Sequence, residues 1–201
     1  MIIWNSRGAA NRGFATVLKD LKFRYKLDIV VILEPRISGP QAERVIKGWG
    51  FNNWVRMESV GFTGGIWIVW ERKDLEVEVI VKKEQFIHCR LCLGSENMLF
   101  TAVYVSPNEQ RRRELWEDVQ GMAADIAEPW MIVGDFNEIR SPLEQKGGGR
   151  VSEVRCGRFN EWIQQCGLVD VESKGPFYTW KGPKWQVLIG CTRNLTVACA
   201  T

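Results

Sequence analysis

"PWMIVGDFNEI", residues 129–139, joins a run of apolar residues to a glycine, an acid and an amide. The apolar part, residues 130–133, is typical of a buried strand. Gly134, Asp135 and Asn137 then follow at a point where a strand needs no such side chains. The stretch therefore raises two questions: which fold buries the strand, and what the polar residues at its end do.

The composition suits a single soluble domain. Of the 201 residues, 45% are hydrophobic and 25% are charged, and no apolar run approaches the roughly 18 residues of a membrane span. The net charge of +3 permits a polyanionic partner without naming one. The start, "MIIWNSRG", lacks the features of a secretory signal, so we expect an intracellular protein with six reduced cysteines and no membrane partner. Nothing in the sequence indicates an oligomer.

Helical and strand patterns alternate at both ends of the chain and enclose a block of strands. Helices are predicted at residues 11–26, 39–50, 107–128 and 155–167. Strands are predicted at residues 1–4, 28–34, 52–59, 64–71, 75–84, 86–93, 98–106, 130–137 and 178–180. The central block of strands argues against a doubly wound parallel sheet. It favours an α/β fold in which two β-sheets pack face to face with helices outside.

Two periodicities predict which faces are buried. In the first helix, apolar residues recur at spacings of three and four, at Phe14, Val17, Leu18, Leu21 and Tyr25. In the strand at residues 75–84, Leu75, Val77, Val79 and Val81 alternate with other side chains, so we expect one dry face and one wet face.

Four of the apolar strands end in functional groups: Asn5, Glu34, Tyr104, and Asp135 with Asn137. A single strand-end acid is usually a turn or capping residue, but a set from four strands predicts a shared cleft. Carboxylate and amide oxygens are ligands for a hard cation such as Mg²⁺, and an acid beside them can orient and deprotonate a water molecule. Amides and a phenol can stabilise charge on a phosphoryl group. The set therefore favours phosphodiester hydrolysis.

Five motifs occur in a characteristic order: "WNSRG" (4–8), "ILEPR" (32–36), "YVSP" (104–107), "VGDFNEI" (133–139) and "YTW" (178–180). From residue 1 to about residue 186, the chain resembles the endonuclease/exonuclease/phosphatase superfamily, and within it the apurinic-endonuclease-like domain of plant LINE-type retrotransposons. This resemblance implies a four-layered α/β sandwich and a phosphodiesterase that uses Mg²⁺ (or Mn²⁺) to nick DNA. Small-molecule phosphatases of the superfamily share these motifs, so DNA as the substrate depends on the resemblance alone.

The resemblance also implies roles for individual residues. It makes Glu34 a metal ligand with Asn5 beside it, Tyr104 a catalytic residue on the phosphate side, Asp135 the acid that orients water, Asn137 the phosphate-binding amide, and Arg7 and Trp180 substrate-binding positions near the cleft.

The chain departs from the family after the last motif. The family continues through a Leu-Asp-Arg segment and a closing Ser-Asp-His motif, and this sequence has neither. Its only histidine, His88, lies within a predicted strand and does not match the catalytic position. Residues 187–201 lack a pattern, and a one-base shift of the reading frame near Gln186 is compatible with two Leu-Asp-Arg triplets. We therefore predict an incomplete domain over residues 1–186 that lacks its last strands, and a frameshifted, unrelated tail over residues 187–201.

Two functions follow as alternatives. The chain is either a metal-dependent nuclease acting on DNA, weak or inactive, or a non-catalytic retrotransposon remnant that binds at most a divalent cation or nucleic acid. The tail is expected to pack poorly or to form an improvised strand.

The remaining motifs have simpler interpretations. Cys89 and Cys92 are spaced like half of a zinc knuckle, but residues three apart on a strand face opposite sides. The basic run at residues 111–113 is expected on a solvated helix face, with contact to DNA as the alternative. "EQKGGGR", residues 144–150, lacks the spacing of a nucleotide-binding loop and is expected to be a flexible loop. Trp67 and Trp70 are expected in the core.

Overall fold

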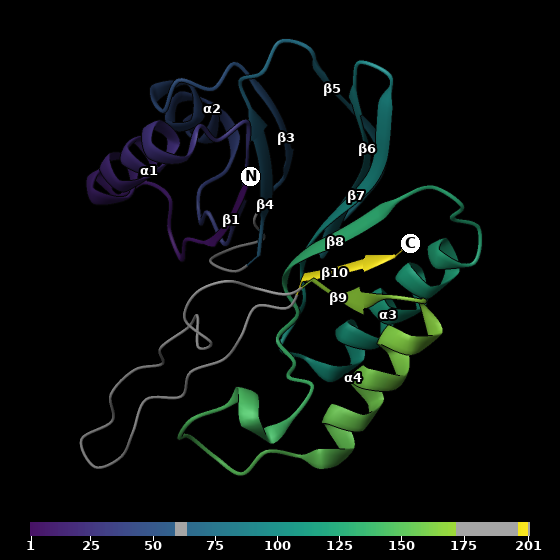
Figure 1. Ribbon diagram of the computed structural model, residues 1–201. Helices are drawn as coiled ribbons and strands as arrows, with labels where there is room; N and C mark the ends of the chain where they lie inside the picture. The colour runs from purple at the N-terminus through teal and green to yellow at the C-terminus, as the bar shows by residue number, and fades with distance from the viewer. Residues whose placement is uncertain (59–63, 172–196, 201) are drawn as a thin grey trace.

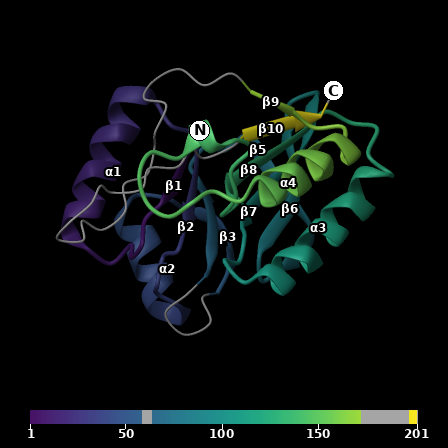
Figure 2. The same cartoon turned by 90° about the horizontal axis from the view of Figure 1, so that it is seen from below.

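The computed structural model describes residues 1–58, 64–171 and 197–200. These residues form an α/β sandwich of two packed β-sheets with helices on both outer faces, as predicted (Figure 1). Seen from below, α1 and α2 lie on one side of the strands, and α3 and α4 lie on the other (Figure 2). Trp180, the predicted strand at residues 178–180 and residues 187–196 of the tail lie outside the described residues.

The first sheet has four strands in the order β1-β2-β4-β3. The strands are β1 (Ile2–Asn5), β2 (Ile29–Leu33), β3 (Asn53–Met57) and β4 (Ile66–Trp70). β1 and β2 are parallel, and the other pairs are antiparallel. The helices α1 (Arg12–Tyr25) and α2 (Gly39–Gly48) cover the outer face of this sheet.

The second sheet has the strand order β5-β6-β7-β8-β10-β9. The strands are β5 (Leu75–Lys83), β6 (Phe86–Leu93), β7 (Glu96–Tyr104), β8 (Trp130–Asp135), β9 (Val169–Asp170) and β10 (Val197–Ala200). β7 and β8 are parallel, and the other pairs are antiparallel. Its outer face is covered by α3 (Glu109–Ala123) and α4 (Glu153–Gln165), and a short 3-10 helix, Pro142–Glu144, lies between β8 and α4.

Three apolar cores hold the four layers together. One core lies between the sheets, one between the first sheet and α1 and α2, and one between the second sheet and α3 and α4. Every residue of β2 and β4 is buried because both faces of these strands are covered. This burial explains why "IVVIL" and "IWIVW" are continuous apolar runs. Trp67 and Trp70 lie in these cores, as expected.

The predicted apolar stripe of α1 is wider than its buried face. Phe14 and Leu18 are buried and Leu21 is partly buried, but the exposed fractions of Val17 and Tyr25 are 47% and 69%. The prediction for these two side chains is therefore wrong. A helix that packs on a single sheet buries only the residues that point directly at it, so the flanks of the stripe stay in solvent.

The predicted alternation of β5 is interrupted by a bulge. Val79 pairs with Cys89 and Val81 pairs with His88, so Ile80 is an extra residue. A bulge reverses which side chains face a given side of the sheet. Accordingly, Val77 packs against the core between the sheets, whereas Val81 packs against the core under α3 and α4, and Val79 is exposed.

Part of the tail forms a strand. The backbone of β10 pairs with β8 on one side, where Val197 lies opposite Val133, and with β9 on the other side. β8 therefore has neighbours on both sides. Across the described ranges, no helix combines the length and apolar character of a membrane span.

Candidate active site

The carboxyl ends of the two parallel strand pairs bring five predicted residues together. Asn5 ends β1, Glu34 follows β2, Tyr104 ends β7, and Asp135 ends β8, two residues before Asn137. We call these five residues the strand-end cluster. The Asn5 side-chain Nδ2 donates a hydrogen bond to Asp135 Oδ2 at 2.8 Å, which links the two sheets. The sandwich therefore places the ends of both parallel pairs at one site, where α/β folds commonly bind ligands.

Glu34 is a buried, ionised carboxylate. It is 9% exposed, and its Oε1 accepts a hydrogen bond from Tyr104 Oη at 2.5 Å. Its Oε2 accepts one from Arg36 Nη2 at 2.8 Å. Burial alone raises the pKa of the Glu34 carboxyl, but the hydrogen bonds from Tyr104 and Arg36 and the charge of Arg36 bring it below its ordinary value. Glu34 therefore carries a negative charge at neutral pH.

The backbone also fixes Glu34 in place. Its φ is 49°, in the left-handed region, where a side chain other than glycine is strained. Its N–H donates to the Gly65 carbonyl at 3.1 Å, and its carbonyl accepts from the Gly8 N–H at 2.9 Å. These bonds hold the carboxylate at the sheet end.

Tyr104 is a neutral hydrogen-bond donor. Burial, followed by the hydrogen bond to Glu34, raises the pKa of the phenol well above its ordinary value. Its proton points at Glu34 rather than at open solvent.

Asp135 is oriented from both sides. Its Oδ2 accepts from Asn5, and its Oδ1 accepts from the backbone N–H of Asn137 at 3.0 Å. Because each carboxylate oxygen has two lone pairs, both oxygens can still bind water.

Asn137 has a left-handed φ of 49°. Its Nδ2 donates to the Val105 carbonyl at 2.6 Å. An amide nitrogen carries two protons, so a second one remains to bind a ligand.

Gly134 is required by the close pairing of β7 and β8. Its φ is +146°, and a Cβ on this residue would lie 1.9 Å from the Val103 carbonyl oxygen. Only glycine lets the strand approach this closely before it presents Asp135.

The donor atoms of the cluster fit a divalent cation that prefers oxygen. Asn5 Oδ1 is buried and has no hydrogen-bond partner among the described residues. An unpaired buried oxygen is costly unless a ligand satisfies it. Mg²⁺ and Mn²⁺ accept carboxylate and amide oxygens, and Mg²⁺ usually keeps several waters, so Glu34 and Asn5 are the residues that would hold such an ion. Within the described ranges, no three or more His, Cys, Asp or Glu side chains lie close enough together to hold a metal ion by themselves.

The other residues named from the sequence are not members of the strand-end cluster, although Arg7 lies in the adjoining loop. Arg7 is exposed, has a φ of 48°, and lies in the loop that follows β1, beside the Gly8 that bonds Glu34. Cys89 lies in the core between the sheets, and burial raises the pKa of its thiol to about 12, so it is a neutral structural side chain.

His88 lies in the interior of the second sheet, as the sequence indicated. Its Nδ1 is 2.8 Å from Thr101 Oγ1, which also accepts a hydrogen bond from Trp130 Nε1 at 2.8 Å. Because Trp130 can only donate, the Thr101 hydroxyl proton can point at His88 Nδ1. Burial and the nearby Arg90 lower the pKa of the imidazole, so it is neutral at pH 7.

Three residues beside the cluster were not predicted from the sequence: Arg36, Arg112 and Glu138. Arg36 is the ionic partner of Glu34 at 2.8 Å. Arg112 was predicted on a solvated face but is 4% exposed, and it pairs with Glu138 at 2.8 Å. The signal was present in the helical period: Arg112 stands three residues before Leu115, on the stripe that includes Val119.

Comparison with known proteins identifies the family of the chain. Residues 2–186 match the family described as the Endonuclease/Exonuclease/phosphatase family. No curated protein sequence matches the chain.

Solved structures share the fold at low sequence identity. An AP endonuclease from Leishmania major has a TM-score of 0.75 and 12% identity over 99% of this chain and 78% of its own. The endonuclease domain of TRAS1, a telomere-specific non-LTR retrotransposon, has a TM-score of 0.68 and 14% identity over 99% and 84%. The 3' phosphatase NExo from Neisseria, bound to a product DNA hairpin, has a TM-score of 0.68 and 17% identity over 99% and 86%.

Proposed function

The chain belongs to the endonuclease/exonuclease/phosphatase family, and from this membership we propose that it is a metal-dependent phosphodiesterase acting on DNA. The observation that carries the proposal is the hydrogen bond between Asn5 and Asp135, 2.8 Å long, beside the ionised Glu34. This hydrogen bond brings the Asn5 amide of the first sheet and the Asp135 carboxylate of the second sheet together beside the Glu34 carboxylate.

We assign the cofactor as Mg²⁺, or Mn²⁺, held by Glu34 and the unpaired Oδ1 of Asn5. A bound cation would neutralise charge on the phosphoryl oxygens and leaving group. Arg36 helps to keep Glu34 ionised and holds one of its oxygens in place.

We assign Asp135 as the residue that orients the attacking water and accepts its proton. Asn5 and the Asn137 N–H hold its two oxygens in a fixed direction, which is the requirement for a general base. Asn137 offers its remaining amide proton to a phosphate oxygen. Tyr104 orients Glu34 through its hydroxyl, and we assign it to the phosphate side of the site.

The choice of DNA as substrate is supported by two proteins of similar fold. Among the proteins of similar fold, NExo is bound to a DNA hairpin and TRAS1 is a retrotransposon endonuclease domain. Arg7, exposed beside the cluster, is assigned to substrate binding, as is Trp180, which lies outside the described residues.

A second candidate is a non-catalytic fold that binds a divalent cation or nucleic acid. It is favoured by His88: the single histidine of the sequence is committed to the core through Thr101 and does not belong to the strand-end cluster. General acid–base groups typically contribute about 10²–10⁴-fold to rate, so a site without an imidazole is expected to be slow.

A plasmid-nicking assay with Mg²⁺ separates the two candidates. Asp135→Ala is expected to reduce nicking by about 10²–10⁴-fold, whereas Asp125→Ala, which removes an exposed acid at the end of α3, serves as the matched control. EDTA should abolish the wild-type reaction. Equal cleavage by the wild type and Asp135→Ala would reject catalysis, and turnover of a small phosphate ester without DNA nicking would reject DNA as the substrate.

A further inference from the structure

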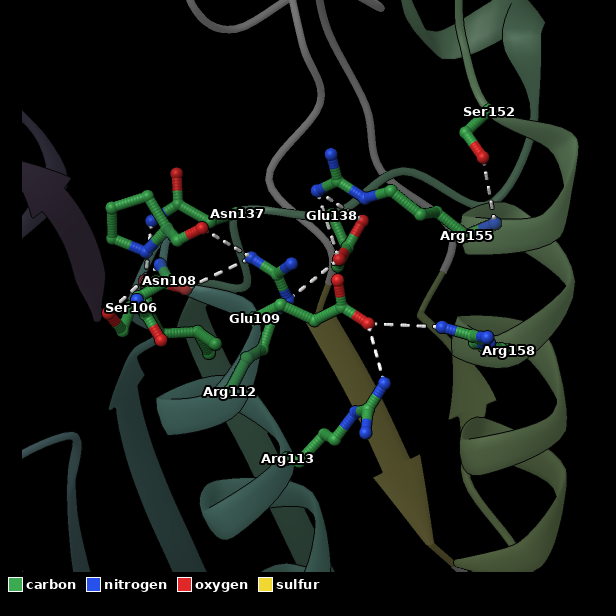
Figure 3. Close-up of polar contacts among 12 residues, drawn as sticks. Ser106, Asn108, Glu109, Arg112, Arg113, Asn137, Glu138, Ser152, Arg155 and Arg158 are labelled. Atoms are coloured by element: carbon green, nitrogen blue, oxygen red, sulfur yellow. Dashed lines mark hydrogen bonds and ion pairs between the residues drawn. The ribbon is translucent and has the colours of Figure 1, made fainter.

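Arg112 is a buried cation beside the strand-end cluster. It lies in the first turn of α3, and its side chain is 5% exposed. Its Nη1 donates to the carbonyl oxygens of Ser106 at 3.1 Å and Pro107 at 3.0 Å. Its Nε pairs with Glu138 Oε1 at 2.8 Å (Figure 3). One guanidinium therefore contacts two separate connections of the chain.

Glu138 is equally buried, at 8% side-chain exposure. It directly follows Asn137, and its carboxylate also accepts from Arg155 of α4 at 3.1 Å (Figure 3). A buried carboxylate with two cationic partners holds its position firmly, because charge-assisted hydrogen bonds from two directions fix both of its oxygens.

We propose that the Arg112–Glu138 pair positions Tyr104 and Asn137 relative to each other, so that Arg112 is a positioning residue of the active site. The inference rests on the proposed function for its catalytic meaning. Tyr104 precedes the connection at residues 105–107, which Arg112 holds through two carbonyls. Asn137 precedes Glu138, which Arg112 holds through its carboxylate.

Asn137 adjoins Glu138, which Arg112 holds. Its φ of 49° lies in the left-handed region, which asparagine adopts more readily than most other residues with a side chain. Asn137 Nδ2 donates to the Val105 carbonyl at 2.6 Å, and Val105 is the first residue of the connection that Arg112 holds. Arg112 therefore fixes the chain on both sides of this hydrogen bond.

The geometry requires arginine in particular. The guanidinium presents several donors in a rigid plane, so it can bond two carbonyls and a carboxylate at once. A lysine carries the same charge at a single nitrogen and cannot bridge both connections in this way. Arg112→Lys therefore removes the bridge and keeps the charge.

A role confined to anchoring α3 is the alternative, and hydrogen exchange distinguishes it. The variants are Arg112→Lys and Glu138→Gln. The matched control is Arg113→Lys, one residue further on, which is 62% exposed and pairs with Glu109. Amide exchange is followed in peptides covering residues 104–108 and 135–139, and in peptides from α3 and α4. Urea unfolding of each variant is measured in parallel.

The expected result is faster exchange in both connections for Arg112→Lys, by about tenfold or more, which corresponds to a loss of about 1.4 kcal/mol in local opening free energy. Exchange within α3 should match the wild type, and Arg113→Lys should be unchanged throughout. Glu138→Gln keeps an acceptor for Arg112 and should show a smaller effect. In the nicking assay, Arg112→Lys should lower kcat by about tenfold and leave KM within about twofold.

Faster exchange confined to α3, or wild-type exchange in either connection, would overturn the positioning role. If Arg112→Lys does not fold, Glu138→Gln decides by the same criterion. Because exchange needs no turnover, a protein that fails to nick DNA disproves the proposed function while the test of Arg112 stays readable.

Discussion

Replacing Gly134 with alanine is the sharpest test of how the second sheet presents Asp135. The added Cβ would lie 1.9 Å from the Val103 carbonyl oxygen, whereas ordinary contact begins at 3.4 Å. The paired backbones would therefore have to separate by roughly 1.5 Å, which breaks ladder hydrogen bonds between β7 and β8. Two such bonds are worth about 1 kcal/mol each, and the positive φ costs an alanine about 1–3 kcal/mol. We expect a loss of about 3–5 kcal/mol in the free energy of unfolding.

The assay is urea unfolding followed by tryptophan fluorescence and circular dichroism. Gly157→Ala is the matched control, because it adds the same methyl group in the middle of α4, where no atom lies within 4 Å. Alanine is the better helix former, so the control should gain about 0.5–1 kcal/mol. A Gly134→Ala protein within about 1 kcal/mol of the wild type would refute the reasoning, because the close approach of β7 and β8 would then not constrain the residue before Asp135.

Three further predictions concern ionisable and metal-binding groups. Mg²⁺ at a concentration about 100-fold above its dissociation constant should raise the free energy of unfolding by about 2.7 kcal/mol. Asn5→Ala should remove most of this gain in a thermal-shift titration. An undiminished gain would place the metal elsewhere. Because the pKa of Glu34 lies below its ordinary value, its stabilisation is complete above about pH 4.3 and is lost as the pH falls through the lower folded pKa. Tyr104→Phe should therefore cost about 1.5–3 kcal/mol at pH 7 and move the acid loss to higher pH, and unchanged urea curves between pH 3 and 7 would contradict this. The pKa of His88 is lowered in the folded protein, so as the pH falls the unfolded chain is protonated before the folded one. The free energy of unfolding should therefore decrease below about pH 6.5, by at most about 1.4 kcal/mol per pH unit. His88→Gln should flatten this dependence, and an unaltered slope would assign it to other groups.

The site residues could be predicted from the sequence because they interrupt runs of apolar residues. Asn5, Glu34 and Asp135 each follow an apolar run at the point where the strand ends, and parallel strands bring such ends together. The continuous apolar run of β2 is also typical of a buried strand. These features depend on neighbours in sequence, so a single chain suffices to read them.

The missed features depend on contacts between distant residues. The helical period could have indicated that Arg112 is buried, but its ionic partner Glu138, in the connection after β8, is identified only by the fold. The bulge at Ile80 follows from the register of β5 against β6, which no local pattern encodes. β10 pairs through its backbone, and backbone pairing leaves little trace in side-chain periodicity.

The hydrogen bond between Asn5 and Asp135 has a consequence for how the protein would change as substitutions accumulate in its gene. It joins two halves of the chain, each with its own helices and apolar core. Many exchangeable apolar side chains maintain those cores, whereas single side chains of fixed chemistry maintain the junction. Under relaxed selection, random substitutions would therefore abolish the chemistry of the site many generations before they abolish the fold. Inherited copies would then remain folded but inactive.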